Sequence, residues 1–330
     1  MWIEAASQSR DPARPEANED ALVLLPGRAF AVIDGVSDRT GARYDGMLSG
    51  RYAARLVAAT LERLIGGTAG PPPVESIVPT LGAAIQEAYR RHFTIDAARA
   101  DWGARLCSTL SLALFEGAQM HLVMVGDSGI RINGREVVQE SKDLDRITST
   151  LRSHAWHRAP GDAAAKDAAA RQVTWGGIGQ DAAAFVPHGL SAEDVAAVGA
   201  AAEAECLAML PHVPRADVAH LIRRGIVGAQ GDYQNNPESV LGYSCLDGFE
   251  IPRTLMRIAT VEARTVETLE MFTDGYFLPG EGFGLEAWEA AHRVVEAEDP
   301  AKVGRFRSTK GSVPGQRWAD DRTYVGVRLS

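Results

Sequence analysis

The chain has 330 residues, of which 45% are hydrophobic and 23% are charged, so a substantial core is available and wholesale disorder is excluded. The formal net charge is −9, and no run of Lys or Arg forms a stripe for a nucleic-acid backbone. The three cysteines, Cys107, Cys206 and Cys245, lie far apart and make neither a disulfide framework nor a zinc pattern.

No targeting or membrane-spanning signal is present. The first ten residues lack a basic segment followed by an apolar one, and no segment reaches the ~18 consecutive apolar residues of a membrane span. We therefore expect a cytoplasmic protein that has neither a membrane nor a nucleic acid as a partner. The sequence does not predict an oligomeric state.

In the first 140 residues, apolar runs predict strands and two helices. Residues 21–25 and 29–33 flank Pro-Gly-Arg, which predicts two strands joined by a turn. Residues 47–65 and 74–93 repeat apolar side chains at helical spacing and predict two amphipathic helices. Three further strands are expected at 108–115, 119–125 and 130–139. The turns between them are short, so antiparallel pairing is favoured over βαβ units.

After residue 140 the character of the chain changes. Strand signals fade between 141 and 237, where helices are expected at 191–209, which begins with a capping-box pattern, and at 214–227. Strands return at 256–261 and 268–272, followed by a helix at 284–297 and a closing strand at 323–329. We therefore expect a single domain over residues 1–330, with a mainly helical insertion at about 141–237.

Five acidic signatures stand where strands are expected to end. Three follow markedly apolar runs and contain Asp34, Asp127 and Asp274; the other two are Asn18-Glu19-Asp20 and Asp320-Asp321. Carboxylates that gather at one edge of a fold repel one another unless a cation neutralises them. All-oxygen sites of this kind suit hard divalent ions, so the pattern predicts a site for Mg²⁺ or Mn²⁺.

The order of these motifs resembles that of the metal-dependent protein phosphatases, the type 2C serine/threonine phosphatases, and especially their bacterial members. The motifs that carry the resemblance are Arg14…Asn18-Glu19-Asp20, Val32-Ile33-Asp34-Gly35, Ser108-Thr109, Val125-Gly126-Asp127-Ser128, Phe272-Thr273-Asp274-Gly275 and Asp320-Asp321-Arg322-Thr323. Each motif alone is weak, but six in order are specific. The resemblance covers about residues 1–140 and 238–330, and the segment between them has no counterpart that we can name.

The resemblance implies an α+β fold, a four-layer α-β-β-α sandwich of two stacked antiparallel sheets flanked by helices. In the family pattern, Asp34 bridges two metal ions and the carbonyl of Gly35 faces one of them. Asp274 and Asp320 would hold the first ion. Asp127, together with Asp274, matches the position that binds a third, weaker ion in bacterial relatives. Asp34 and Asp274 are therefore the expected centre of the catalytic site.

The resemblance also assigns the second ion and the phosphate. Glu19 and Asp20 would hold or orient waters on the second ion. The arginine that grips the phosphate stands four residues before the glutamate in the family, where this chain has Pro15. Arg14 takes this role if the loop carries an insertion, and Arg10 is the alternative.

The activity implied is hydrolysis of phosphoserine and phosphothreonine monoesters on proteins. Two divalent ions would attract the phosphate and lower the pKa of a water molecule that attacks phosphorus in line. No covalent intermediate is needed, and the sequence has no nucleophile signature such as Gly-x-Ser-x-Gly. The expected partners are a phosphorylated protein substrate and a cognate kinase.

Two alternatives stay open. Relatives usually continue the Asp-Gly motif with a residue and two glycines, whereas this chain has Val36-Ser37-Asp38 and a displaced arginine. Those departures favour a non-catalytic, phosphatase-like binding module. The insertion at 141–237 instead favours a phosphatase of a small phosphorylated metabolite, for which it would shape a closed pocket.

Overall fold

The structure is a computed structural model that describes residues 1–36, 41–67, 69–313, 315 and 317–329. These residues form two compact units. The first, the sandwich unit, comprises residues 1–141, 243–293 and 321–330; the second, the helical unit, comprises residues 142–242 and 294–320. The insertion expected at about 141–237 thus lies almost entirely in the helical unit, which also takes in a second segment near the C-terminus. That the whole chain is a single domain stays a prediction.

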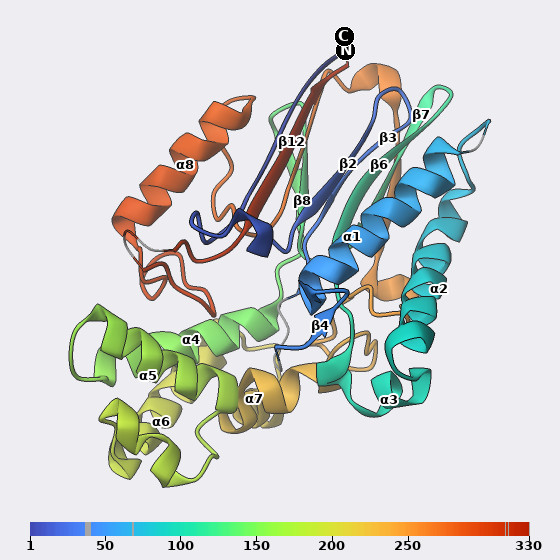
Figure 1. Cartoon of the computed structure of the whole chain (residues 1–330). Helices are drawn as coiled ribbons and strands as arrows, with labels where there is room; N and C mark the ends of the chain where they lie inside the picture. Colours follow the sequence, from blue (N-terminus) through green and yellow to red (C-terminus); the bar gives the residue numbers. More distant parts are fainter. Residues whose placement is uncertain (37–40, 68, 314, 316, 330) are drawn as a thin grey trace. The chain divides into compact units, whose positions relative to one another are not determined.

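Two five-stranded antiparallel sheets are formed by the described residues of the sandwich unit, in the orders β1-β12-β11-β8-β9 and β10-β7-β6-β3-β2. The first sheet consists of β1 (Trp2–Gln8), β8 (Gly129–Ile132), β9 (Glu136–Val138), β11 (Thr268–Phe272) and β12 (Arg322–Arg328). The second consists of β2 (Ala21–Leu25), β3 (Ala29–Ile33), β6 (Leu110–Glu116), β7 (Gln119–Val125) and β10 (Arg257–Glu262). Pairing of Trp2 with Arg328 brings the two ends of the chain side by side (Figure 1).

Strand β3 shows why the two sheets stack. All five of its residues are buried, and neighbouring side chains of a strand point to opposite faces. Phe30 and Val32 join a core between the sheets that also includes Met271 and Val325 of the first sheet. Ala29, Ala31 and Ile33 face the other way. A strand buried on both faces reads as a continuous apolar run, which is the pattern of residues 29–33.

Helices cover the outer face of each sheet. On the side of β3, α1 (Ser49–Leu61) and α2 (Val74–His92) contribute Val57 and Ile85 to the core that includes Ile33. On the first sheet, α8 (Leu285–Glu298) packs Trp288 against Phe272 and Tyr324. The expected α+β fold, with two stacked antiparallel sheets and helices on both outer faces, is therefore confirmed (Figure 1). A short hairpin, β4 (Arg43–Tyr44) and β5 (Met47–Leu48), precedes α1, and α3 (Ile95–Ala100) follows α2.

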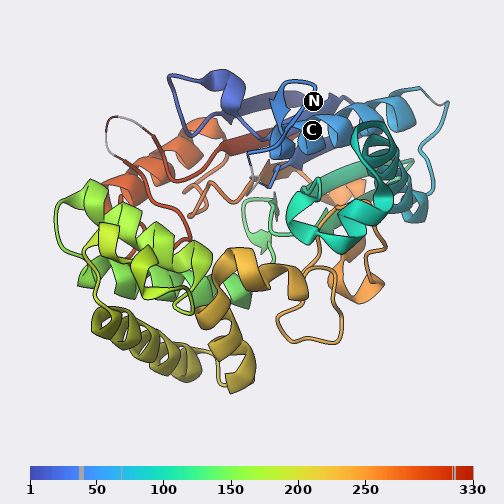
Figure 2. The ribbon, with the colours of Figure 1, turned by 60° about the horizontal axis from the view of Figure 1, so that its bottom comes forward.

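In the described part of the helical unit, four α-helices pack against one another (Figure 2). They are α4 (Asp143–Arg158), α5 (Ala163–Gly176), α6 (Ala192–Met209) and α7 (Arg215–Ala229). The capping box predicted before α6 is present, since Ser191 and Asp194 bond each other's main chain. None of the helices formed by the described residues is long and apolar enough to cross a membrane.

Candidate metal centre

Three aspartates from three strand ends meet in the sandwich unit. Asp34 follows β3, Asp127 follows β7 and Asp274 follows β11, and the ligand oxygens that they offer all lie within 4.8 Å of one another. Asp127 is buried and the other two are half-buried. We call these three residues the aspartate cluster. Like charges at this separation repel strongly, so a cation that neutralises them would stabilise the arrangement.

Glycines allow the main chain to approach closely beside Asp34. A Cβ added to Gly35 would lie 2.2 Å from the carbonyl oxygen of Gly50 and 2.6 Å from that of Glu19. Gly50 stands in the first turn of α1, so the helix begins directly against the Asp34-Gly35 corner. The positive end of the helix dipole favours acidic groups there. The sequence analysis missed Gly50 because nothing local distinguishes it from an ordinary helical glycine.

The turn that carries Asp127 is held by hydrogen bonds to its neighbours. Gly126 has φ +81°, and an added Cβ would lie 2.7 Å from Cγ2 of Thr109. The hydroxyls of Thr109 and Ser128 are hydrogen-bonded at 2.7 Å. The side-chain amide of Gln139 donates to the carbonyl of Asp127 at 2.9 Å. The main chain on both sides of Asp127 is thus fixed before any ion binds.

Asp20 belongs to a buried polar network behind the cluster. The Thr273 hydroxyl donates to Asp20 Oδ2 at 2.8 Å and accepts from the Thr323 amide at 2.8 Å, while the Asp20 amide donates to Asn18 Oδ1 at 2.9 Å. Burial, and then the charge of Asp321, hold the pKa of Asp20 well above its usual range. No described residue hydrogen-bonds to the buried Asp20 Oδ1.

These residues fit a divalent ion. The donor set consists of carboxylate and carbonyl oxygens, which Mg²⁺ and Mn²⁺ prefer. A nearby cation would also lower the cost of ionising the buried Asp20, whose pKa is raised by burial and by Asp321. Oxygen donors gathered in this way, and a buried carboxyl that is costly to ionise without a cation, both suit a metal site.

Asp321 fastens the loop that carries Glu19. Its two carboxylate oxygens accept from the amides of Arg10, at 2.6 Å, and Glu19, at 2.9 Å. Nη2 of Arg10 lies 3.9 Å from Glu19 Oε2. Arg14 instead pairs with Asp11 at 2.6 Å, and its side chain is 68% exposed. The sequence offers two arginines for the phosphate. Of these, Arg10 lies near Glu19, whereas Arg14 lies beside Asp11.

Asp320 belongs to the helical unit. Both of its carboxylate oxygens accept hydrogen bonds from Lys310 Nζ, at 3.0 and 2.9 Å. Its role as a metal ligand, like the roles of Glu19 and Asp20, stays a prediction. Ser37 and Asp38, which replace the glycine pair of the family pattern, lie outside the described residues.

No protein-family model matches the chain, and no curated protein matches it. Solved structures do. The serine/threonine phosphatase PstP/Ppp of Mycobacterium tuberculosis is 17% identical over 100% of both chains, with a TM-score of 0.47. The catalytic domain of PstP in complex with 2 manganese ions is 18% identical over 98% of this chain and 96% of its own, with a TM-score of 0.45. Stp1 of Staphylococcus aureus, a serine/threonine phosphatase, is 12% identical over 100% and 96%, with a TM-score of 0.45.

Proposed function

We propose that the protein hydrolyses phosphoserine and phosphothreonine monoesters on proteins in a metal-dependent reaction. The observation that supports this most directly is the aspartate cluster, Asp34, Asp127 and Asp274, with ligand oxygens within 4.8 Å of one another. Three carboxylates so close together suit a hard divalent cation and no neutral ligand. When bound, two such ions would neutralise the phosphate and lower the pKa of the attacking water.

The chain's own residues would have separate tasks. Asp34 and Asp274 would hold the ions on the catalytic side, with the Gly35 carbonyl and Asp320 as further ligands, and Asp127 would hold a weaker third ion. Glu19 and Asp20 would orient waters of the second ion. Arg10, whose guanidinium lies 3.9 Å from Glu19, would grip the phosphate in preference to Arg14. No group on the chain need form a bond to phosphorus.

The substrate is proposed to be a phosphorylated protein, with a cognate kinase as the source of the phosphate and the cytoplasm as the location. A panel of phosphopeptides tested against sugar and nucleotide phosphates decides between this substrate and a small metabolite. A preference of kcat/KM for the phosphopeptides is the expected result. A preference for one metabolite would replace the proposed substrate and leave the metal chemistry in place.

The test of the activity is hydrolysis of p-nitrophenyl phosphate with Mn²⁺, with and without EDTA. We expect the wild type to lose turnover in EDTA. We expect Asp274→Asn to lose more than about 100-fold, the upper end of the effect of a residue that merely supports a ligand. Asp96→Asn, a change of the same kind at a side chain that is 91% exposed, is the matched control and keeps full activity. Turnover that persists without metal would overturn the proposal.

Thermal unfolding separates an inactive binding module from an enzyme. Mn²⁺ at about 100 times its Kd should stabilise the wild type by about 2.7 kcal/mol, and this gain should vanish in Asp274→Asn. Stabilisation by Mn²⁺ without turnover on any phosphate ester would favour the non-catalytic alternative. If Mn²⁺ neither stabilises the wild type nor supports turnover, the proposed metal site itself is refuted.

A further inference from the structure

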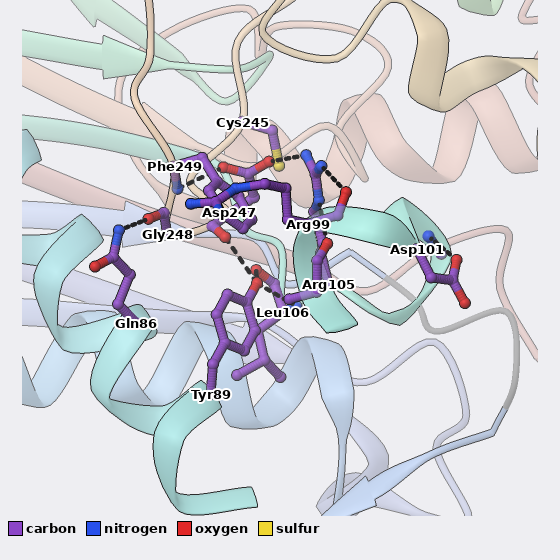
Figure 3. A network of polar contacts seen from close by, with 12 residues as sticks. Gln86, Tyr89, Arg99, Asp101, Arg105, Leu106, Cys245, Asp247, Gly248 and Phe249 are labelled. Carbon is purple, nitrogen blue, oxygen red and sulfur yellow. Dashed lines mark hydrogen bonds and ion pairs between the residues drawn. The ribbon is translucent and has the colours of Figure 1, made fainter. Parts of the chain in front are cut away.

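One segment of the sandwich unit joins the aspartate cluster to helix α2. It comprises residues 243–249, and we call it the brace. It lies 100 residues or more from both Asp127 and Asp34 in the sequence, yet it bonds the main chain beside Asp127 directly and that beside Asp34 through Ser108. Its other end is anchored by a polar network with α2 and with the residues before β6 (Figure 3). None of the residues proposed as metal ligands lies in this segment, so the proposed function gives the brace no role.

At the end near the cluster, the brace bonds the turn of Asp127. The amide of Gly126 donates to Ser244 Oγ at 2.9 Å, and Ser244 is 1% exposed. Gly126 has a left-handed φ of +81°, a conformation that glycine adopts without steric cost. A buried amide without an acceptor is costly. The Ser244 hydroxyl therefore fixes the direction of the Val125–Gly126 peptide, one residue before Asp127.

The brace is also linked to the Asp34-Gly35 corner, through Ser108. Leu246 and Ser108 exchange two main-chain hydrogen bonds, at 3.0 and 2.9 Å. Ser108 in turn forms a β-bridge with Gly35, and the next amide, that of Thr109, donates to the Asp34 carbonyl at 2.8 Å. A displacement of the brace would consequently reach the main chain on both sides of the cluster.

The far end of the brace is held by a buried carboxylate. Asp247 is 0% exposed, accepts from Arg105 Nη1 at 2.8 Å and accepts from the Phe249 amide at 3.0 Å. The guanidinium of Arg105 lies 4.6 Å from the centre of the Phe249 ring. The Tyr89 hydroxyl of α2 donates to the Asp247 carbonyl at 2.7 Å and accepts from the Leu106 amide at 3.0 Å (Figure 3). An ion pair with these bonds is rigid, so the brace is a fixed support and not a mobile loop.

We propose that Ser244 is a positioning residue of the metal centre. Its hydroxyl holds the Gly126 amide and thereby sets the direction in which the Asp127 carboxylate meets a divalent ion. The inference rests on the proposed function, because it takes the aspartate cluster to be a metal site. It adds a residue that touches no ion and is invisible to motif comparison, since it lies 118 positions from Gly126 in the sequence.

The first test is a calorimetric titration of the full chain with Mn²⁺. Ser244→Ala should weaken the ion held by Asp127 by about 10- to 100-fold, the usual cost of removing a residue that supports a ligand. Ser244→Thr keeps the hydroxyl and should restore most of the affinity. Ser153→Ala is the matched control. It is a buried serine of the helical unit that bonds one main-chain carbonyl, and it should leave every Mn²⁺ affinity unchanged.

A double-mutant cycle with Asp127→Asn separates positioning from general destabilisation. If Ser244 acts through Asp127, then Ser244→Ala should change the remaining Mn²⁺ affinities less than twofold once Asp127 is already replaced. An additive loss, or full Mn²⁺ affinity in Ser244→Ala alone, would overturn the inference. A wild type that binds no Mn²⁺ would instead overturn the proposed function, so the two failures are distinct.

A metal-free measurement completes the test. In EDTA, amide hydrogen exchange at Gly126 should be at least about tenfold faster in Ser244→Ala than in the wild type, because the amide loses its acceptor. Exchange at Leu246, which bonds Ser108 and not the Ser244 side chain, should change much less. Equal exchange at Gly126 in both proteins would show that the hydroxyl does not hold this amide.

Discussion

The helical unit and the aspartate cluster of the sandwich unit differ in how their buried charges are arranged. Opposite charges are paired in the helical unit, whereas like charges are gathered in the cluster. In the helical unit, Arg152 is 1% exposed and donates to Asp167 at 2.7 Å, and the fully buried Lys302 donates to Glu296 at 2.6 Å. Around the cluster, like charges are gathered, and burial with the charge of Asp321 raises the pKa of Asp20. Charges of the first kind are paired with opposite charges of the chain, whereas a bound divalent cation would neutralise the second kind under the proposed function.

Elsewhere in the sandwich unit, a buried carboxylate is paired with an arginine of the same unit. Arg131 grips the buried Glu270 with two hydrogen bonds, at 2.6 and 2.7 Å, and its guanidinium lies 4.9 Å from the ring centre of Trp288. A two-pronged pair of this kind is what a fold uses to bury a carboxylate safely. The cluster is therefore a local exception within its own unit, and such exceptions mark functional sites.

The largest effect that tests this contrast is the loss of the Arg152 pair. Arg152→Met removes one of the two arginines that pair with Asp167, the other being Arg317, and two hydrogen bonds to the carbonyls of Ala301 and Lys302. Breaking a buried ion pair on one side costs about 3–5 kcal/mol. Because Arg317 still pairs with Asp167, the free energy of unfolding in urea should fall by about 3 kcal/mol, the lower end of that range. The Mn²⁺ affinity of the cluster should stay unchanged, because the helical unit neutralises its own charges.

The matched control is on the same helix. Arg158→Met also removes an arginine of α4 from an aspartate, Asp194, but this arginine is 50% exposed. An exposed pair contributes about 0–1 kcal/mol, so this variant should unfold nearly as the wild type does. Equal losses for the two variants would show that burial of the Arg152 pair is not what matters, and a change in Mn²⁺ affinity would show that the two regions are coupled.

This contrast also marks the limit of what the sequence predicts. The apolar runs before Asp34, Asp127 and Asp274 identify strands and the acids that follow them, because both signals are local. The sequence analysis expected Asp34 and Asp274 to meet, and the structure brings them together. Helix α1 was expected from residue 47 and begins at Ser49, since residues 47–48 pair as a strand.

Features that depend on packing between distant segments were not predictable. Gly50 and Ser244 look ordinary in the sequence and gain their roles only from contacts with Gly35 and Gly126. The buried Arg152 reads as a surface charge until the 294–320 segment covers it. The sequence likewise does not show that Asp321, 311 positions away, bonds the amide of Arg10 and so holds this arginine near Glu19.

An intermediate effect concerns pH, which should act on the two regions with opposite sign. The unfolded chain releases the proton of Asp20 near pH 3.9, whereas burial and Asp321 raise the folded pKa, so stability without metal falls as the pH rises above about 4. The slope is at most about 1.4 kcal/mol per pH unit. Asp20→Asn removes this loss, so in EDTA it should become progressively more stable than the wild type between pH 4 and pH 7.

Glu205 of the helical unit provides the opposite case. Burial raises its pKa, but hydrogen bonds from Arg307 and His154 outweigh burial and leave the pKa lowered. Its contribution is present above about pH 4.3 and is lost as the pH falls through the folded pKa. Glu205→Gln should therefore be less stable than the wild type at pH 7, by under about 1 kcal/mol since the side chain is 37% exposed, and equal to it near pH 3. Parallel pH profiles for the two variants would refute the contrast.

A last effect is on substrate binding and not on stability, and it distinguishes the two arginines near the loop that carries Glu19. Arg10 is tied to this loop, because its amide bonds Asp321 at 2.6 Å and its guanidinium lies 3.9 Å from Glu19 Oε2. Arg10→Ala should raise the KM for p-nitrophenyl phosphate about tenfold, or about 1.4 kcal/mol, by removing a two-pronged contact with the phosphate. Arg14→Ala, the matched control, removes an exposed pair with Asp11 and should change KM less than twofold. The reverse order would restore the assignment made from motif spacing, and it would require the loop to turn Arg14 away from Asp11 when phosphate binds.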